Sequence, residues 1–370
     1  RWSRMHLRVW CIRRLEMSVL RPLATMIRSA PLLAWVMRRL GATVGSNLQC
    51  AHDAQLLGPL ALLQVGDDVA IQTGACVSTT RWIDQELQVG PVRLENNCKL
   101  GMRSGVASGV TVGAGSWITP LTSVLNDVGP GEMWEGSPAR FTGRYRRLQR
   151  TTDHLHYRLP PVALEMLNIL MQVVLEICLV VMPTAFIAWL ATSIIPPANA
   201  EYFSVTALSA IVWQIALYAF TTTWTTIILV SVLVCLFVRF TAFSPGLYPA
   251  KGLKSALLLY RVKKLNQVQR LWTWTITGQY LRALAGLRLR RSGASECDLM
   301  QNLVPELVSA DPQVFWSHGC FTNVLDYGSE SLRLGRLDMP ANFFASNNCV
   351  AEYGQLPSNF LLGVLSLIHI

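Results

Sequence analysis

Charge is scarce in this chain. Asp, Glu, Lys and Arg together make up 15% of the residues, against 51% that are hydrophobic. The scarcity is most marked between Leu159 and Val238, where the sequence contains no Lys or Arg. Two apolar segments in this region, 166–195 and 203–240, are each longer than the ~20 residues that span a bilayer. The missing charge therefore predicts transmembrane helices.

Basic residues gather instead at both outer ends of this apolar region. By the positive-inside rule both flanks are then cytoplasmic, so the number of crossings is even. We predict two crossings, and four remain open because the second segment could break at 220–224. Glu165 is expected at the membrane interface, whereas Glu176 is a candidate functional acid within the first span.

The chain also lacks the motifs that would explain its net charge of +10 by nucleic-acid binding. It contains no zinc module, no RNP-like motif and no basic region on heptads. Its nine cysteines form no CxxC pair and no metal-ligand spacing, so they are interpreted as reduced core residues and no metal site is predicted. Two basic segments with aromatics, 1–23 and 251–272, are expected to form amphipathic helices on the inner leaflet, where lipid head groups explain the charge.

A period of six residues is the strongest positive signal. Branched apolar residues recur in this step at Leu94, Leu100, Val106, Val112, Ile118 and Val124. Earlier sets keep the same step, at Val44, Cys50, Leu56 and Leu62 and, after a slip of three residues, at Val65, Ile71 and Val77. A six-residue repeat is typical of a β-helix, in which each hexapeptide forms one short strand and one corner of a coil.

The pattern returns after the membrane region. RRSGA at 290–294 echoes RRLGA at 38–42. Phe344, Val350, Leu356 and Leu362 step by six, at a constant offset of 244 from the first ladder. The second ladder is imperfect on this alignment, because Asp338 falls at the place of Leu94 and Pro357 at that of Gly113. We therefore expect a second, truncated β-helix.

The order of these parts resembles a known family. GATVGSNLQC, LLQVGDDVAIQTGACVSTT, LENNCKLGMRSGVASGVTVGAG and WEGSPAR are similar to the left-handed β-helix of hexapeptide-repeat acyltransferases. With membrane segments after WEGSPAR, the chain resembles the C-terminal half of epsilon-poly-L-lysine synthetase-type nonribosomal peptide synthetases. The resemblance implies a mainly β fold with transmembrane α-helices: tandem left-handed parallel β-helices joined by a transmembrane helical hairpin.

This organisation divides the chain into five parts. They are a basic interfacial helical segment (1–40), the first β-helix (41–145), the transmembrane helices (160–242), a second basic interfacial segment (251–292) and the truncated second β-helix (293–370). The chain begins with Arg rather than Met and ends at LIHI, which fits no repeat, so we expect a fragment of a longer protein. Both β-helices are expected on the cytoplasmic side.

The ladder breaks once, at 78–93, and in this family such a loop carries the active residues. The family's Thr-His pair, aromatic and acid match Thr79, Thr80, Trp82 and Asp84, so Thr80 stands where the usual general base, His, is expected. The candidate catalytic residues are therefore Asp84, Thr80 and His52, and the candidate substrate-binding residues are Arg81, Thr79 and Trp82. For His52 and His318 the sequence favours surface positions in polar turns over a catalytic role.

The resemblance implies transfer of a carrier-bound aminoacyl group to a free amine. The donor would be the phosphopantetheine arm of a carrier domain, or coenzyme A, with no cofactor bound directly. Carrier and adenylation domains are expected partners, together with the lipid bilayer and a trimer-like set of β-helices. Two alternatives stay open, a silent scaffold that positions carrier domains and a coenzyme A-dependent transferase for a small acceptor. A gamma-type carbonic anhydrase is excluded because the first β-helix contains only His52.

Overall fold

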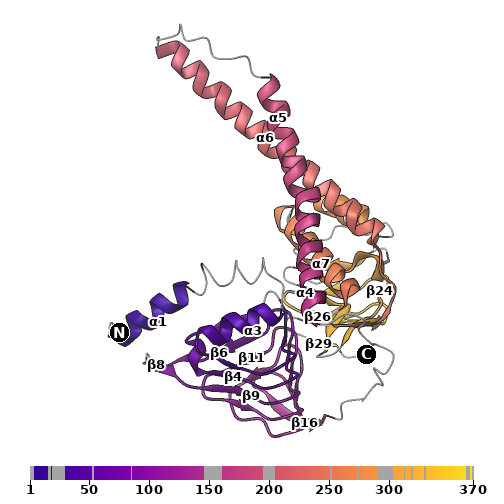
Figure 1. The fold of residues 1–370 in the computed structure, drawn as a ribbon. Coiled ribbons are helices and arrows are strands. Elements are labelled where there is room, and N and C mark those ends of the chain that lie inside the picture. The colour runs from indigo at the N-terminus through magenta and orange to yellow at the C-terminus, as the bar shows by residue number, and fades with distance from the viewer. Residues whose placement is uncertain are drawn as a thin grey trace.

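The computed structural model comprises two β coils and a long helical hairpin (Figure 1). The residues that it describes are 4–15, 18, 30–51, 54–84, 86–145, 161–194, 205–250, 252–272, 275–289, 303–311, 313–317, 320–328, 331–363 and 367–368.

The first coil is built from three sheets that run along its length. One sheet contains β1 (Thr43–Val44), β4 (Leu63–Val65), β9 (Val92–Leu94) and β12 (Thr111–Val112). The second contains β2 (Gln49–Cys50), β5 (Ala70–Ile71), β10 (Lys99–Leu100), β13 (Trp117–Ile118) and β15 (Glu132–Glu135), with β16 (Arg140–Arg144) antiparallel at its edge. The third contains β3 (Gln55–Leu57), β6 (Cys76–Ser78), β11 (Gly105–Val106) and β14 (Ser123–Val124).

The six-residue period sets the length of one turn of the coil. Lys99 pairs in parallel with Trp117, so three hexapeptides complete one turn. Every residue of the ladder from Leu94 to Val124 is at most 2% exposed, and these side chains fill the coil. The predicted ladder is therefore confirmed for this stretch. Each buried aliphatic stabilises the folded state because its side chain is removed from water on all sides.

Two insertions interrupt this period without breaking the stack. Thr43 pairs with Gln64, and this turn of the coil is longer than a regular one by the 3-10 turn η2 (Leu60–Leu62). This 3-10 turn accounts for the three-residue slip in the sequence pattern. Leu63, at 1% exposure, takes the inward position expected for Leu62. A longer insertion lies between Cys76 of β6 and its partner Gly105 of β11, and it forms a hairpin.

The second coil repeats the first. Its strands are β18 (Arg288–Leu289), β19 (Val308–Ala310), β20 (Phe315–Trp316), β21 (Phe321–Asn323), β24 (Leu337–Met339), β25 (Phe344–Ala345), β26 (Val350–Glu352), β27 (Gly354–Gln355), β28 (Leu361–Leu362) and β29 (Leu367–Ile368), with η4 (Pro305–Leu307) and a hairpin of β22 (Leu325–Tyr327) and β23 (Ser331–Leu334). Thr43 of β1 corresponds to Arg288 of β18, and Lys99 of β10 corresponds to Phe344 of β25.

This correspondence corrects the predicted offset of 244 for Phe344 and Val350, which is too small by one position there. The offset is confirmed for Leu356 and Leu362, because the turn from Phe344 to Leu361 has 17 residues instead of 18. A shift of one residue moves every side chain of a strand to the other face. Ala345 therefore points inward, at 3% exposure, whereas Phe344 is 40% exposed. Met339 occupies the inward place of Leu94, and Asp338 lies on the outer face, where its carboxylate accepts a hydrogen bond from Ser309. The second ladder is thus less degraded than the sequence alignment indicated.

The predicted echo at 290–294 lies outside the described residues. The structural counterpart of Gly41, which has a φ of 95°, is Gly286, with a φ of 111°. Both glycines link a helix to the first strand of a coil, because a positive φ suits glycine. The helices concerned are α3 (Ala30–Arg39) and α8 (Ile276–Leu284).

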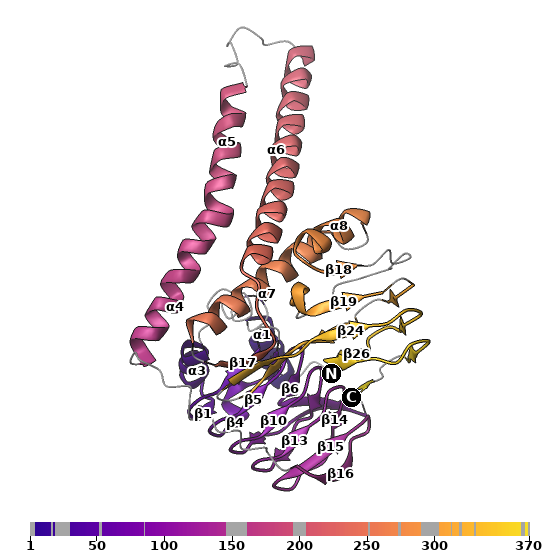
Figure 2. The ribbon, with the colours of Figure 1, turned by 90° about the vertical axis from the view of Figure 1, so that its right-hand side faces the viewer.

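The helical hairpin extends away from both coils (Figures 1 and 2). Its first arm is α4 (Pro161–Glu176), the π-helical turn η3 (Ile177–Val181) and α5 (Met182–Ile194), and its second arm is α6 (Val205–Phe240). Within the described residues, Met166–Ala191 and Val212–Phe240 are long and apolar enough to cross a membrane. Helix α6 is continuous through 220–224, where the sequence had left a break open.

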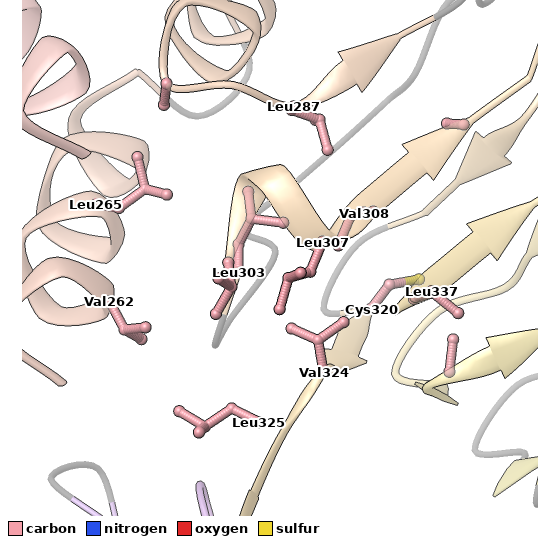
Figure 3. Packing of buried hydrophobic residues seen from close by; sticks show 14 of the residues in the cluster. Val262, Leu265, Leu287, Leu303, Leu307, Val308, Cys320, Val324, Leu325 and Leu337 are labelled. Atoms are coloured by element: carbon pink, nitrogen blue, oxygen red, sulfur yellow. The ribbon is translucent and has the colours of Figure 1, made fainter. Parts of the chain in front are cut away.

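The base of this hairpin is joined to the second coil by α7 (Leu253–Leu271). Val262 and Leu265 of α7 belong to the same core cluster as Leu303, Leu307 and Val324 of the coil (Figure 3). The helix was predicted to lie on the membrane surface, but two of its cations are buried and paired with protein carboxylates. Arg261 contacts Glu306 at 2.9 Å, and Lys264 contacts Glu176 at 2.5 Å. These pairs form because a buried cation needs an opposite charge.

Candidate functional site

The predicted active loop is the hairpin that leaves the first coil. Its strands are β7 (Thr80–Ile83) and β8 (Glu86–Val89), antiparallel and paired from Thr80 with Val89 to Ile83 with Glu86. Asp84 begins the turn with a φ of 45°, a conformation that Asp tolerates better than most residues. We call β7, β8 and this turn the first hairpin, and β22 with β23 the second hairpin.

Thr79 anchors the first hairpin to the coil. Its side chain is buried, and its hydroxyl donates to the carbonyl oxygens of Leu57 at 3.2 Å and Pro59 at 3.3 Å. The backbone amide of Thr79 also donates to the carbonyl of Leu57, at 2.9 Å. A side chain held in this way contributes to the position of the hairpin rather than to contact with a substrate.

Thr80 takes part in a local turn with Ser78. The Ser78 hydroxyl donates to the Thr80 carbonyl at 2.6 Å and lies 3.5 Å from the Thr80 hydroxyl. These bonds orient the strand where it leaves the coil. Neither residue supplies a general base, since an alcohol at neutral pH holds its proton.

Three candidate residues extend along the hairpin. Trp82 is 54% exposed, and its ring centroid lies 5.4 Å from that of His6 in α1 (Arg4–Leu15). Asp84 is exposed at the turn. Arg81 is half-buried, and its Nε atom has no hydrogen-bond partner among the described residues. The hairpin therefore carries an exposed carboxylate at its turn and a half-buried cation whose Nε atom is enclosed without a hydrogen bond among the described residues.

The structure describes only some of the histidines that could serve this site. His52 and His318 lie outside the described residues. His6, which sequence analysis did not single out, is the histidine that the structure brings to the first hairpin. Nothing in the sequence signals this contact, because His6 and Trp82 lie far apart along the chain. Among the described residues no group of His, Cys, Asp and Glu has the arrangement of a metal site.

The second hairpin packs on the outer face of the first coil. The Lys99 ammonium donates to both carboxylate oxygens of Asp326 in β22, at 2.7 and 2.9 Å. The side-chain amide of Gln72 donates to the same carboxylate. Nearby, Arg103 donates to Asn348 at 2.9 Å and its guanidinium lies 4.7 Å from the ring centre of Phe321.

Apolar contacts continue this junction. Met102 and Leu121 of the first coil pack on Phe321 and Val350 of the second. The two coils are thus joined through a hairpin of one and a sheet face of the other. Sequence analysis missed this junction, since its ion pair links residues 227 positions apart.

The Lys99 ammonium is the principal charge in this junction. Burial lowers its pKa, but the carboxylate of Asp326 and the hydrogen bond to it act in the opposite direction, and the net effect raises the pKa above 10.5. Lys99 consequently stays charged at neutral pH. Its side chain is 18% exposed and that of Asp326 is 23% exposed, so the pair is largely shielded from water.

Comparison with known proteins finds a limited likeness to solved structures alone. No protein-family model matches the sequence, and no curated protein matches it. Among solved structures, a hexapeptide-repeat-containing acetyltransferase from Vibrio cholerae is 16% identical, with 38% of this chain and 93% of that one covered, at a TM-score of 0.30.

Two further structures show a similar degree of likeness. A galactoside acetyltransferase in complex with coenzyme A is 18% identical over 39% of this chain and 86% of that one, at a TM-score of 0.29. Serine acetyltransferase from Brucella abortus strain S19 is 21% identical over 29% and 41%, at 0.24. All three of these structures are acetyltransferases by name, and each match covers less than half of this chain.

Proposed function

We propose that this chain is a membrane-anchored acyltransferase region that moves an acyl group from a thioester to a free amine. The observation that carries the proposal is the first hairpin, which leaves the first coil between β6 and β11 and carries Arg81 and Asp84. A cation and a carboxylate on one short hairpin suit a zwitterionic acceptor.

The chemistry requires one bond to form and one to break. The acceptor amine attacks the thioester carbonyl carbon, the carbon–sulfur bond breaks, and the thiol leaves with a proton that the amine gives up. In the first hairpin, Arg81 would pair with the carboxylate of a free amino acid and Asp84 with its ammonium. An exposed carboxylate is a weak base at neutral pH, so the roles of Asp84 and Arg81 are binding and orientation.

The finer assignment rests on the family resemblance. In that assignment the coils are left-handed, the donor is an aminoacyl group on the phosphopantetheine arm of a carrier domain, and carrier and adenylation domains are the partners. Coenzyme A ends in the same thiol arm, so acetyl transfer from coenzyme A to a small acceptor is the closest variant. His52 remains a candidate base for either donor.

A scaffold function is the second candidate, and specific observations favour it. Thr79 is used as a structural anchor, Thr80 stands in place of a histidine, and Asp84 is exposed. A first hairpin with these properties can position a carrier domain without performing transfer.

Transfer is tested with the full chain in lipid nanodiscs. An aminoacyl-pantetheine thioester and acetyl-coenzyme A are supplied separately with free amino acids, and thiol release and amide product are measured by mass spectrometry. We expect Asp84→Asn to lower the transfer rate by about tenfold, since one charge-assisted contact to the acceptor is lost. Glu86→Gln, an exposed acid on the same hairpin, is the matched control and should retain the rate.

Two outcomes decide between the candidates. Equal rates in wild type and Asp84→Asn, or no transfer from either donor, favour the scaffold. A faster rate in Thr80→His would identify the first hairpin as a site that has lost its base.

We also propose that both coils face the cytoplasm, as multi-pass insertion with an even number of crossings requires. The two spanning segments and the basic residues on their outer flanks support this orientation. In sealed vesicles, cysteines placed at Arg140 and Lys254 should be labelled from the same side, and one at Asn199 from the other. Labelling of Arg140 and Lys254 from opposite sides would overturn the orientation.

A further inference from the structure

Two thiols lie side by side inside the second coil. The Sγ atoms of Cys320 and Cys349 are 3.4 Å apart, and the two residues are 6% and 1% exposed. Both are free cysteines in the structure, and Cys320 lies among the core residues of Figure 3. We propose that they form an oxidation site, at which hydrogen peroxide converts the two thiols reversibly into a disulfide that fastens the second hairpin. This site is separate from acyl transfer and goes beyond the proposed function.

The backbone places the two cysteines at the spacing that a disulfide needs. Phe321 of β21 pairs in parallel with Val350 of β26, and each cysteine directly precedes one of these partners. The Phe321 amide donates to the Cys349 carbonyl at 3.0 Å, so the cysteines lie on adjacent turns of the coil. Neighbouring strands are about 4.8 Å apart, which falls within the roughly 4.4 to 6.8 Å between the Cα atoms of a disulfide. The bond therefore requires rotation of the two side chains and little movement of the backbone.

The first coil has no thiol at the equivalent positions. By the correspondence between the coils, Ala75 stands at the place of Cys320 and Ser104 at that of Cys349. Both residues are buried, at 0% and 1% exposure, and the Ser104 hydroxyl donates to the Gly101 carbonyl at 2.8 Å. The same fold is thus built without sulfur at either position, so packing alone does not require the thiol pair.

The surroundings of the two thiols give them different roles. The hydrogen bond from the Cys349 thiol lowers the pKa of Cys320, and the positive charge of Arg103 in the first coil acts in the same direction, against the effect of burial. The pKa of Cys349 is raised, chiefly because its thiol takes part in that hydrogen bond, and burial adds to the effect. Cys320 is therefore the thiol that reacts first, as a thiolate, and Cys349 holds its proton until it attacks.

The reaction balances with hydrogen peroxide as the oxidant. The Cys320 thiolate attacks one peroxide oxygen, the oxygen–oxygen bond breaks, and the leaving hydroxide takes up the proton that Cys320 had lost. The Cys349 sulfur then attacks the sulfur of the Cys320 sulfenic acid, the sulfur–oxygen bond breaks, and a second water leaves with the proton of Cys349. Two thiols lose two electrons, and peroxide is reduced to two water molecules. Peroxide is close to water in size, which suits a thiol with so little exposure.

The disulfide would close a loop that contains the second hairpin. The two thiols are 29 positions apart, and β22 and β23 lie between them. Strand β22 carries Asp326, which binds Lys99 of the first coil. Arg103 of the first coil contacts the neighbours of both thiols, because its guanidinium lies on the ring of Phe321 and donates to Asn348. The oxidation site therefore lies at the base of the junction between the coils, and the cross-link restricts the hairpin that forms this junction.

The test uses the full chain in lipid nanodiscs and needs no acyl donor or acceptor. Wild type is treated with hydrogen peroxide, free thiols are blocked with N-ethylmaleimide, and peptide mass spectrometry quantifies the Cys320–Cys349 disulfide before and after reduction with dithiothreitol. We expect this disulfide to form about tenfold faster than Cys98 is oxidised in the same sample, since burial raises the pKa of Cys98 to about 12.

Two variants separate the chemistry from its structural effect. Cys349→Ser removes the second thiol and places there the residue that the first coil has, so Cys320 should remain a sulfenic acid that dimedone labels. In wild type, oxidation should slow amide hydrogen exchange along β22 and β23 about tenfold, because the closed loop opens less often, and exchange along β11 should be unchanged. Cys320→Ala, which matches Ala75, is the control in which peroxide should leave the exchange of all three strands as it was.

Three results would overturn the proposal. The first is the absence of the Cys320–Cys349 disulfide, or its formation no faster than the oxidation of Cys98. The second is a Cys349→Ser variant that dimedone does not label at Cys320. The third is a disulfide that leaves the exchange along β22 and β23 at the rate of the reduced protein.

Discussion

The two coils follow the same path but are stabilised in different ways. The first fills its interior with a regular column of aliphatics from Leu94 to Val124. The second has the smaller Ala345 and Ala351 in its interior, and its core cluster continues into α6 and α7, as Val234 and Leu258 show. A coil with weaker internal packing is therefore supported by helices from outside.

The two hairpins also differ in how their bases are held to the coils. The base of the first hairpin is polar, with Thr79 bonded to backbone carbonyls. The second hairpin has Val324 at the place of Thr79, and this side chain is 0% exposed within the core cluster. One backbone design thus accepts either hydrogen bonds or apolar packing where the hairpin leaves the coil.

The largest expected effect separates the inside of the first coil from its outside. Val65→Asp places an unpaired carboxylate in a narrow apolar interior, at a cost of about 5 kcal/mol. Gln64→Asp, one residue away and exposed beside Arg93, should leave stability within about 0.5 kcal/mol of wild type. Thermal unfolding followed by circular dichroism measures both. Similar losses in the two variants would contradict the inward register.

The second test concerns the helical support of the second coil. Arg261 donates to the Val238 carbonyl at 2.6 Å and is paired with Glu306. Arg261→Met therefore removes the donor to a buried carbonyl and leaves the Glu306 carboxylate without its cation, although the Phe243 amide still donates to it at 2.7 Å. The expected loss is about 3 to 5 kcal/mol. Protease sensitivity of the second coil should rise while the first coil is unchanged. Arg239→Met, at the exposed end of α6, is the control, and equal sensitivity in both variants would argue against a supporting role for Arg261.

A smaller effect is expected at the base of the first hairpin. Gly58 has a φ of 89°, and an added Cβ atom would lie 2.5 Å from the Thr79 hydroxyl oxygen. Gly58→Ala should therefore cost about 2 kcal/mol through backbone strain and displacement of Thr79. Hydrogen exchange should accelerate along β7 and β8 but not along β11. Unchanged exchange in the hairpin would show that Thr79 does not hold it.

The smallest effect is a pH dependence at the junction between the coils. The folded pKa of Lys99 is raised above 10.5, so its stabilising contribution is complete below that pH and is lost as pH rises through the folded value. The loss should be about 1 kcal/mol, because the pair is partly exposed. Exchange of β22 amides, referenced to those of β11, measures it. Lys99→Met should remove the dependence, and a variant with the same alkaline profile as wild type would exclude Lys99 as its source.

The sequence predicted what depends on neighbouring residues. The ladder from Leu94 to Val124 was readable because each residue packs on its counterparts one turn away along a regular path. The hairpin was readable as a break in that path. The offset of 244 was right for Leu356 and Leu362 but wrong by one residue at Phe344, because an exposed aromatic is indistinguishable by hydropathy from an inward one.

The site was less predictable than the fold. Thr79 matched a family position, yet it is buried as an anchor, a role that depends on the carbonyls of Leu57 and Pro59. Lys99 and Asp326 carry no local signal that they meet, because their pairing depends on how two separate coils pack. His6 on Trp82 is likewise a product of tertiary structure.

The turn of three hexapeptides also governs how such a chain can change in length. Removing a full turn would leave every remaining strand above an equivalent neighbour. The second coil also has a turn of 17 residues, from Phe344 to Leu361, and Leu362 still lies inward above Ala345, so the missing residue was taken from a corner. The 3-10 turn and the first hairpin show the other permitted route, since their additional residues leave the stack at corners. The length of this architecture can thus change by whole turns or at the corners between strands, and the corners are where new binding properties can be acquired without disturbing the core.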